Sequence, residues 1–207
     1  MTQEEYGAKK AALIEEIERA FDGVARGNGP TLHEANAMDR WDGPHAERAA
    51  RRRDSETRWQ DIPQDVLYLV PLVATFLNPA GFRYYLPAYL IWYIHELDTP
   101  ADGGDSEDSA GFDPLAFFYI SLLGSGTPVM DFRTSSKLNL LSAEQSRAVA
   151  HFLEFEVLRA GFYFDLYQEK PEGEDAEYWP QVRAIEVDFL SSGAQSALKE
   201  YWGQFLK

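Results

Sequence analysis

Apolar residues recur at three- and four-residue spacing along most of the chain, which is the pattern of amphipathic helices. The first such segment covers residues 3–26, where charged residues separate Leu13, Ile17 and Phe21. The last begins at Pro180 and runs towards Phe205. We find neither an internal repeat nor the strict apolar and polar alternation of half-buried strands. The pattern predicts a mainly α protein, a single compact domain of six or seven helices with little or no sheet.

Two helix starts carry the capping-box pattern, in which a Ser or Thr is followed three residues later by Glu or Gln. The first pairs Thr31 with Glu34, and the second pairs Ser142 with Gln145. We expect the second helix to run to about Ala160. The spacing of the first helix predicts that it buries apolar side chains at Leu32, Ala35, Met38 and Trp41.

The segment 76–89 is strongly apolar, with five aromatic residues, two prolines and Arg83 as its one charge. From Arg83 to Leu97, apolar residues fall on both faces of an expected helix, which indicates burial at the centre of a domain. Pro87 would lie in the first turn of that helix, where a missing amide costs least. We expect a single domain, 1–207, with three regions. Residues 1–58 would form an N-terminal helical layer and residues 59–160 an aromatic core region. Residues 161–207 would form an acidic loop and a C-terminal helix.

Composition narrows the class of protein. The chain has 207 residues, no cysteine and a net charge of −15. It shows no secretory signal and no apolar run near the ~20 residues of a membrane span, so we expect a cytoplasmic protein that does not bind membranes. Nucleic acid is a poor partner, because phosphate neutralisation needs a basic surface.

The negative charge is concentrated in two stretches. Residues 84–132 contain no Lys or Arg and have a net charge of −8, and a second acidic stretch runs from Asp165 to Asp188. Such asymmetry can steer an oppositely charged partner, although acidity also serves solubility. The sequence contains no catalytic constellation, so we expect a protein-binding protein with a basic partner, such as an immunity protein that neutralises a bacterial toxin. The expected contact residues are Glu96, Asp98, Asp102, Asp105, Glu107, Asp108, Glu172, Glu174, Asp175 and Glu177.

An alternative is an enzyme or small-ligand binder with a pocket around His33 and Arg83. A buried arginine needs a partner, so the favoured interpretation of Arg83 is structural, with an ion pair to an acid such as Asp61 and stacking on Tyr84 or Trp59. The functional interpretation is that Arg83 anchors an anionic ligand. The ligand-binding residues would be His33, Arg83, Tyr84 and Tyr85.

Metal and cofactor chemistry has little support in the sequence. His33-Glu34 lacks the second histidine four residues after the first that a thermolysin-like zinc site needs, because residue 37 is alanine. His151 and Glu154 share one helix face, but further ligands would have to come from distant segments. We therefore expect no metal site, no cofactor and no catalytic residue.

Three segments together resemble an uncharacterised family of small bacterial proteins: Thr31–Ala35 with Asp39, Trp59–Pro63, and Phe76–Tyr89. A weaker fourth segment begins at Leu140. The resemblance covers about residues 10–160, whereas the loop at 99–111 and the tail beyond 165 look like additions or variable regions. It implies a compact cytoplasmic bacterial domain of unknown function, and it implies no catalytic residues.

Overall fold

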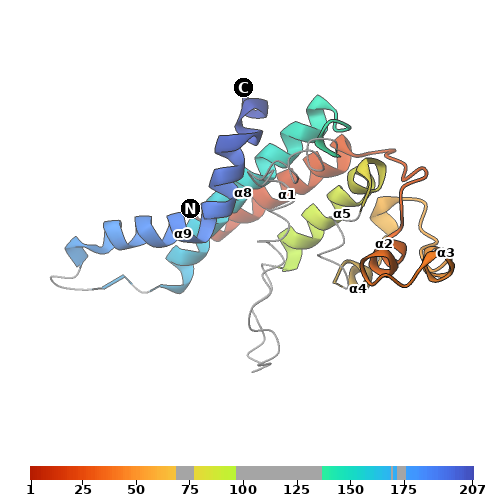
Figure 1. The fold of residues 1–207 in the computed structure, drawn as a ribbon. Coiled ribbons are helices and arrows are strands. Elements are labelled where there is room, and N and C mark those ends of the chain that lie inside the picture. Colours follow the sequence, from red (N-terminus) through yellow and green to blue (C-terminus); the bar gives the residue numbers. More distant parts are fainter. Residues whose placement is uncertain (69–76, 97–136, 169, 172–175) are drawn as a thin grey trace. The chain divides into compact units, whose positions relative to one another are not determined.

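The structure is a computed structural model that describes residues 1–68, 77–96, 137–168, 170–171 and 176–207 (Figure 1). Within these ranges it contains seven α helices and no strand, which confirms the predicted mainly α class. The α helices are α1 (Gln3–Ala20), α2 (Leu32–Asp39), α3 (Pro44–Arg51), α4 (Gln64–Tyr68), α5 (Pro79–Glu96), α8 (Ala143–Tyr167) and α9 (Trp179–Glu200). Two 3-10 helices are also present, η1 (Trp59–Asp61) and η5 (Trp202–Leu206).

The chain divides into two compact units. The C-terminal unit combines Met1–Glu16 with Ala143–Lys207, and the second unit contains Ile17–Ser142. The three regions expected from the sequence have their boundaries at residues 58 and 160, which differ from the boundaries of these two units. That subdivision stays a prediction.

The C-terminal unit is built on the antiparallel pair α8 and α9, with the start of α1 packed on α8 (Figure 1). Tyr6 of α1 stacks on Phe162 at 4.2 Å between ring centroids and on Phe155 at 5.4 Å. The Glu16 carboxylate lies 2.9 Å from the His151 ring nitrogen Nδ1. Contacts at two separated points therefore hold the first four turns of α1 against α8.

The core of the second unit is α5, which begins earlier than the sequence pattern indicated. Asn78 caps this helix, because its side-chain oxygen accepts from the Gly81 amide at 2.8 Å, and Pro79 occupies the first helical position. Pro87 therefore lies inside the helix, and the predicted first-turn position is wrong. The asparagine–proline pair is a helix-start signal, which the sequence interpretation missed.

Glycine allows the chain before α2 to approach the first turn of α5. A Cβ atom at Gly29 would lie 2.6 Å from the Gly81 amide nitrogen, which is closer than real Cβ contacts allow. A Cβ at Gly81 would in turn lie 3.3 Å from the Pro30 carbonyl oxygen. The two glycines bring backbone against backbone at this crossing, so a side chain at either position would push the segments apart.

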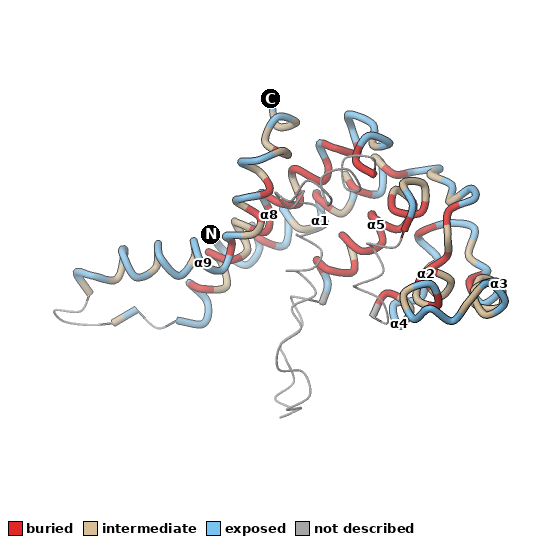
Figure 2. The backbone as a smooth tube through the Cα atoms, viewed as in Figure 1, coloured by how far each residue is buried: buried red, intermediate tan, exposed pale blue. Residues whose placement is uncertain are grey.

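Helix α5 is apolar on all sides and is buried, as predicted (Figure 2). Nearly every side chain from Phe82 to Ile94 is shielded from solvent, with Arg83 and Ile91 partly exposed. Trp59 of η1 is also buried and donates from its indole nitrogen to the Phe21 carbonyl at 2.9 Å.

Two further helix boundaries differ from the sequence predictions. α1 ends at Ala20 and not near residue 26, because the chain turns at Gly23, whose φ of 67° favours glycine. α8 continues past Ala160 to Tyr167. α9 is continuous from Trp179 to Glu200, so the last helical segment ends as an α helix before Phe205.

The capping box of α2 is confirmed, whereas part of its predicted apolar face is wrong. Thr31 accepts from the Glu34 amide and Glu34 accepts from the Thr31 amide, each at 3.2 Å. Leu32 and Ala35 are buried, but Met38 is exposed and Trp41 is 91% exposed. α2 ends before Trp41, whose φ of 57° directs the chain away from the helical path.

Candidate functional site

Exposed apolar side chains concentrate in one short part of the C-terminal unit. Among the described residues, seven of the eleven exposed large apolar side chains lie between Leu166 and Leu190. Four of them recur at spacings of four, three and four residues, so they share one face of α9 and the turn that precedes it. We call this set the apolar stripe, and it consists of Tyr178, Val182, Ile185 and Phe189.

The stripe lies opposite the face of α9 that packs on α8. At about 100° per residue, Val187 and Ala194 fall roughly on the far side of the helix from the stripe. A Cβ at Gly161 of α8 would lie 3.9 Å from a Val187 methyl carbon, and Ala194 is buried. Phe189 is 75% exposed and Ile185 is 67% exposed. In Figure 2 the first half of α9 is accordingly drawn mostly as exposed.

Acidic side chains border the stripe on both sides. Glu186 and Asp188 are exposed, and each falls about 80° from the stripe centre, in opposite directions around the helix. Glu177 is exposed just before the stripe begins. The resulting surface is an apolar ridge between two acidic edges.

The pairing of α8 with α9 fixes the position of this surface within the unit. Arg183 donates to Asp165 through two nitrogens, at 2.5 and 2.7 Å. That bond lowers the pKa of Asp165 and raises the pKa of Arg183. Phe164 packs against Trp179 with ring centroids 5.4 Å apart. These contacts occupy the inner side of the hairpin and leave the stripe uncovered.

Most of the predicted contact residues lie outside the described part of the chain. These are Asp98, Asp102, Asp105, Glu107, Asp108, Glu172, Glu174 and Asp175. Glu96 is the last residue of α5, and Glu177 is exposed beside the stripe. The sequence interpretation placed the second acidic stretch at the interface, but it missed the apolar stripe that overlaps the end of that stretch. The signal was the spacing of residues 178, 182, 185 and 189.

The residues of the ligand-binding alternative take part in bonds that join segments of the second unit. Asp54 accepts from the His33 backbone amide at 3.1 Å, and its other carboxylate oxygen lies 2.5 Å from the ring nitrogen Nδ1 of His33. Asp54 itself is buried. The adjacent Glu34 accepts from Arg51 at 2.6 Å. The start of α2 is thus bonded to α3 through Arg51 and to the segment after α3 through Asp54.

Arg26 contacts both tyrosines of the predicted ligand-binding set, and the ion pair and stacking expected for Arg83 stay a prediction. The Arg26 guanidinium carbon lies 5.9 Å from the Tyr84 ring centroid, and Arg26 donates to the Tyr85 hydroxyl at 3.1 Å. Both tyrosines are buried, whereas Arg83 is partly exposed. Burial raises the pKa of Tyr84 to about 12, and it raises the pKa of Tyr85 against the opposing effect of Arg26. His33, Tyr84 and Tyr85 therefore contribute to packing between segments, and the ligand-binding alternative for them stays a prediction.

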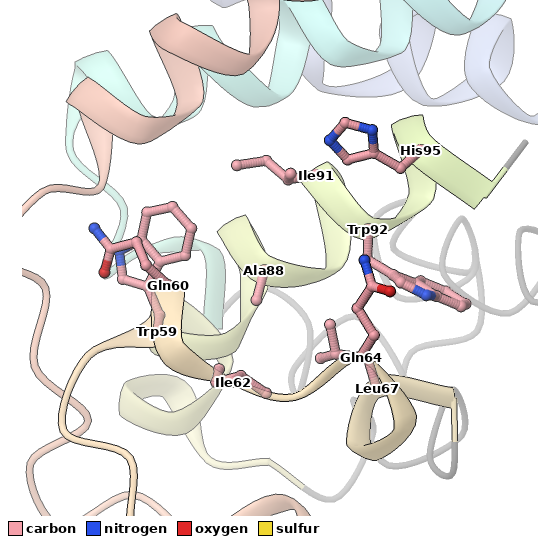
Figure 3. Close-up of a pocket in the computed structure, with 9 residues that line it drawn as sticks. All are labelled: Trp59, Gln60, Ile62, Gln64, Leu67, Ala88, Ile91, Trp92 and His95. Carbon is pink, nitrogen blue, oxygen red and sulfur yellow. The ribbon is translucent and has the colours of Figure 1, made fainter. Parts of the chain in front are cut away.

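A separate pocket lies in the second unit, between η1 and α4 on one side and α5 on the other (Figure 3). Its volume is about 160 Å³. None of its lining residues belongs to the predicted ligand-binding set. They are Trp59, Gln60, Ile62, Gln64, Leu67, Ala88, Ile91, Trp92 and His95.

Comparison with known families gives one match. A family of unknown function (DUF6714) matches residues 9–205, which is nearly the whole chain. The chain belongs to this family. The match extends beyond the range 10–160 expected from the motifs, and it includes the acidic stretch and α9. Neither the curated proteins nor the solved structures include a match to the chain.

Two of the segments that carried the family resemblance line the same pocket in the second unit. Trp59, from the segment Trp59–Pro63, lines the pocket together with Ala88 from the segment Phe76–Tyr89. His33, from the segment Thr31–Ala35, is held by Asp54 at the start of α2. Membership of the family does not assign a role to any of these residues.

The described part of the chain shows neither a metal-binding cluster nor a membrane-spanning helix. In those ranges no group of three or more His, Cys, Asp or Glu side chains could hold a metal ion. No helix there combines the length and the apolar character needed to cross a bilayer.

Proposed function

We propose that this protein binds a basic protein partner through the apolar stripe of α9. The observation that supports the proposal is the stripe itself: four apolar side chains on the solvent side of a helix, with acidic residues along both edges. Soluble monomers rarely expose contiguous apolar surface without a binding role. The acidic edges define the chemistry of the occupant, because opposite charges at the rim steer and orient a partner.

The charge favours a different protein over a second copy of this chain. Residues 165–188 have a net charge of −6. Two copies that joined their stripes would bring these stretches together, and like charges repel across an interface. A partner with lysine or arginine beside an apolar ridge would replace that repulsion with attraction.

The geometry suits an amphipathic helix as the contacting element of the partner. A stripe with spacings of four, three and four residues matches the apolar side of a second helix packed alongside it. We therefore expect the partner to present a helix with leucine-like residues on one face and basic residues on both sides of that face.

The finer hypothesis is that the partner is a bacterial toxin and that this chain acts as its immunity protein. It rests on the net charge of −15 and on the two acidic stretches. Co-expression with a candidate basic toxin tests it, because an immunity protein restores growth and the variant I185Q/F189Q would not. Rescue that is undiminished by this variant would refute a role for the stripe in neutralisation.

A designed peptide pair tests the binding proposal with probes of defined chemistry. One labelled helical peptide has leucine on one face and lysine at its edges, and the second has glutamate in place of every lysine. In fluorescence anisotropy the lysine peptide should bind the wild-type protein, and the glutamate peptide should not. The stronger test is the variant I185Q/F189Q, which removes apolar surface while it preserves charge and helix propensity.

The controls separate the stripe from the overall charge. L140Q removes an exposed apolar side chain from the second unit, and it should bind the lysine peptide as the wild type does. I185Q/F189Q should weaken binding at least about tenfold, the effect of losing ~1.4 kcal/mol. E186K/D188K should weaken binding and reduce its salt dependence. Equal binding by wild type and I185Q/F189Q would refute the stripe as the docking surface, and self-association lost in the same variant would identify a second copy as the occupant.

A further inference from the structure

The pocket beside α5 differs from the apolar stripe in chemistry and in position along the chain. Its inner wall is apolar and buried, and includes Trp59, Leu67, Ala88 and Trp92. The side chains of Gln60, Gln64 and His95, which also line the pocket, are polar and exposed. The site therefore has an apolar interior and a polar mouth, which is the usual organisation of a small-molecule pocket.

The volume limits the size of a ligand. An apolar cavity of ~150 Å³ is large enough to hold benzene. The pocket here has about 160 Å³, so it can accept one ring together with a small substituent. A drug-sized molecule would not fit, since such ligands occupy pockets of roughly 300 Å³ or more.

The lining also limits the charge and polarity of a ligand. No Asp, Glu, Lys or Arg is among the nine lining residues. A charged molecule would lose its hydration in the apolar interior without gaining an opposite charge there. The Gln64 side chain offers both an amide donor and an amide acceptor, which together match the edge of another amide.

The geometry points to a binding site for an uncharged, planar, single-ring molecule with an amide or lactam edge. The ring would lie in the apolar interior formed by α5, η1 and α4, and the amide edge would face Gln64 (Figure 3). Figure 3 shows the lining side chains of η1 and α4 on one side of the pocket and those of α5 on the other. Three of the lining residues, Trp59, Gln60 and Ile62, come from one of the segments that carried the family resemblance.

Tryptophan indole signals provide a direct readout in the full chain. The probe is benzamide, titrated into protein labelled with ¹⁵N at tryptophan. The signals of Trp59 and Trp92 should move saturably, with a Kd in roughly the millimolar range expected of so small a ligand. The signal of Trp41, which is 91% exposed and outside the pocket, should not move.

Two further probes test the chemical class of the ligand. Toluene retains the ring and lacks the amide, and it should bind less tightly than benzamide. Benzoate carries a charge, and it should bind at least about tenfold less tightly because its hydration is lost without compensation. Benzoate that binds as tightly as benzamide would overturn the assignment of an uncharged ligand.

Variants localise the binding to the pocket. A88L places a larger side chain in the apolar interior and should abolish binding of both benzamide and toluene. Q64A alters an exposed side chain at the mouth, so it should leave the fold intact and weaken benzamide binding while toluene binding is unchanged. D65A alters the neighbouring exposed residue of α4, which does not line the pocket, and should have no effect.

The proposal has clear failure outcomes. No movement of the Trp59 and Trp92 signals at about 20 mM benzamide, more than tenfold above a millimolar Kd, would overturn it. Movement that persists in A88L would also overturn it, because the ligand would then bind elsewhere. Q64A provides a test that does not depend on whether A88L folds.

Discussion

Helices α5 and α9 are both rich in large apolar residues, yet they use them in opposite ways. In α5 these residues are buried around the whole helix, from Phe82 to Ile94. In the first half of α9 they are exposed, and Phe189 is the clearest case at 75%. Apolar content therefore does not by itself identify the core of this protein.

Within α9, side-chain size runs against the usual rule for burial. The buried residues of this helix are small, namely Ser191, Ala194 and Ala197. The large apolar residues of the stripe face solvent. Small residues at the packed face allow α9 to lie close to its neighbours, and Gly161 of α8 contributes to the same close approach. The comparison indicates that α5 stabilises the fold, whereas the stripe is available for a partner.

The largest expected effect is on the α5 side of the comparison. Phe82 is buried in the first turn of α5, so F82A should lower the free energy of unfolding by about 3–5 kcal/mol. F189A in α9 is the matched variant, and it should change that free energy by no more than about 0.5 kcal/mol. Urea unfolding of both variants provides the measurement, and similar losses in the two would remove the distinction between the helices.

A second prediction tests whether α8 supplies the C-terminal unit with a core of its own. Arg159 donates to Glu156, a carboxylate that is 2% exposed, at 2.7 Å. R159L removes this charged donor, and the loss of a hydrogen bond to a charged group typically costs about 1.5–3 kcal/mol. R147L changes an exposed arginine of the same helix and serves as the control. Equal stability of R159L and R147L in urea would show that the ion pair contributes nothing to this core.

A third prediction concerns the start of α5. Asn78 accepts from the Gly81 amide, and N78A should lower the free energy of unfolding by about 1 kcal/mol through loss of this cap. N139A alters an exposed asparagine outside any helix and should have little effect. A cost for N78A no greater than that for N139A in thermal unfolding would contradict the assigned helix start.

The smallest expected effect lies at the α8–α9 hairpin. Asp165 and Arg183 are both substantially exposed, so R183A should cost less than about 1 kcal/mol and the cost should shrink in high salt. Because the bond to Arg183 lowers the folded-state pKa of Asp165, its contribution is present above the pKa of an unfolded aspartate. That contribution is lost as the pH falls through the folded-state pKa. A difference between wild type and R183A that grows on acidification would contradict this linkage.

Much of the fold was predictable from local patterns. The α2 capping box and the burial of α5 follow from residue types at fixed spacing, and both predictions are confirmed. The early start of α5 was missed because the sequence analysis did not consider Asn78 as a cap before Pro79. The exposure of Trp41 could not be predicted from its helical spacing, since α2 ends before it reaches that residue.

The candidate sites were less predictable, because they depend on contacts between distant segments. Arg26 donates to Tyr85 across 59 residues of sequence, and no local pattern indicates that contact. The pocket likewise combines η1 and α4 with a helix that begins more than ten residues later. The charge pattern indicated residues 165–188 as a candidate binding region. Hydrophobic spacing alone, however, does not distinguish an exposed apolar face from a buried one.

The central claim is that the fold of the free chain leaves the apolar stripe of α9 open. The most direct test is the free energy of unfolding of I185Q/F189Q, measured in urea beside the wild type. The stripe makes little contribution to the fold on this account, so the two values should agree within about 0.5 kcal/mol. A loss of about 2 kcal/mol or more, the cost of truncating a buried residue, would mean that the stripe is part of the core and would contradict the account.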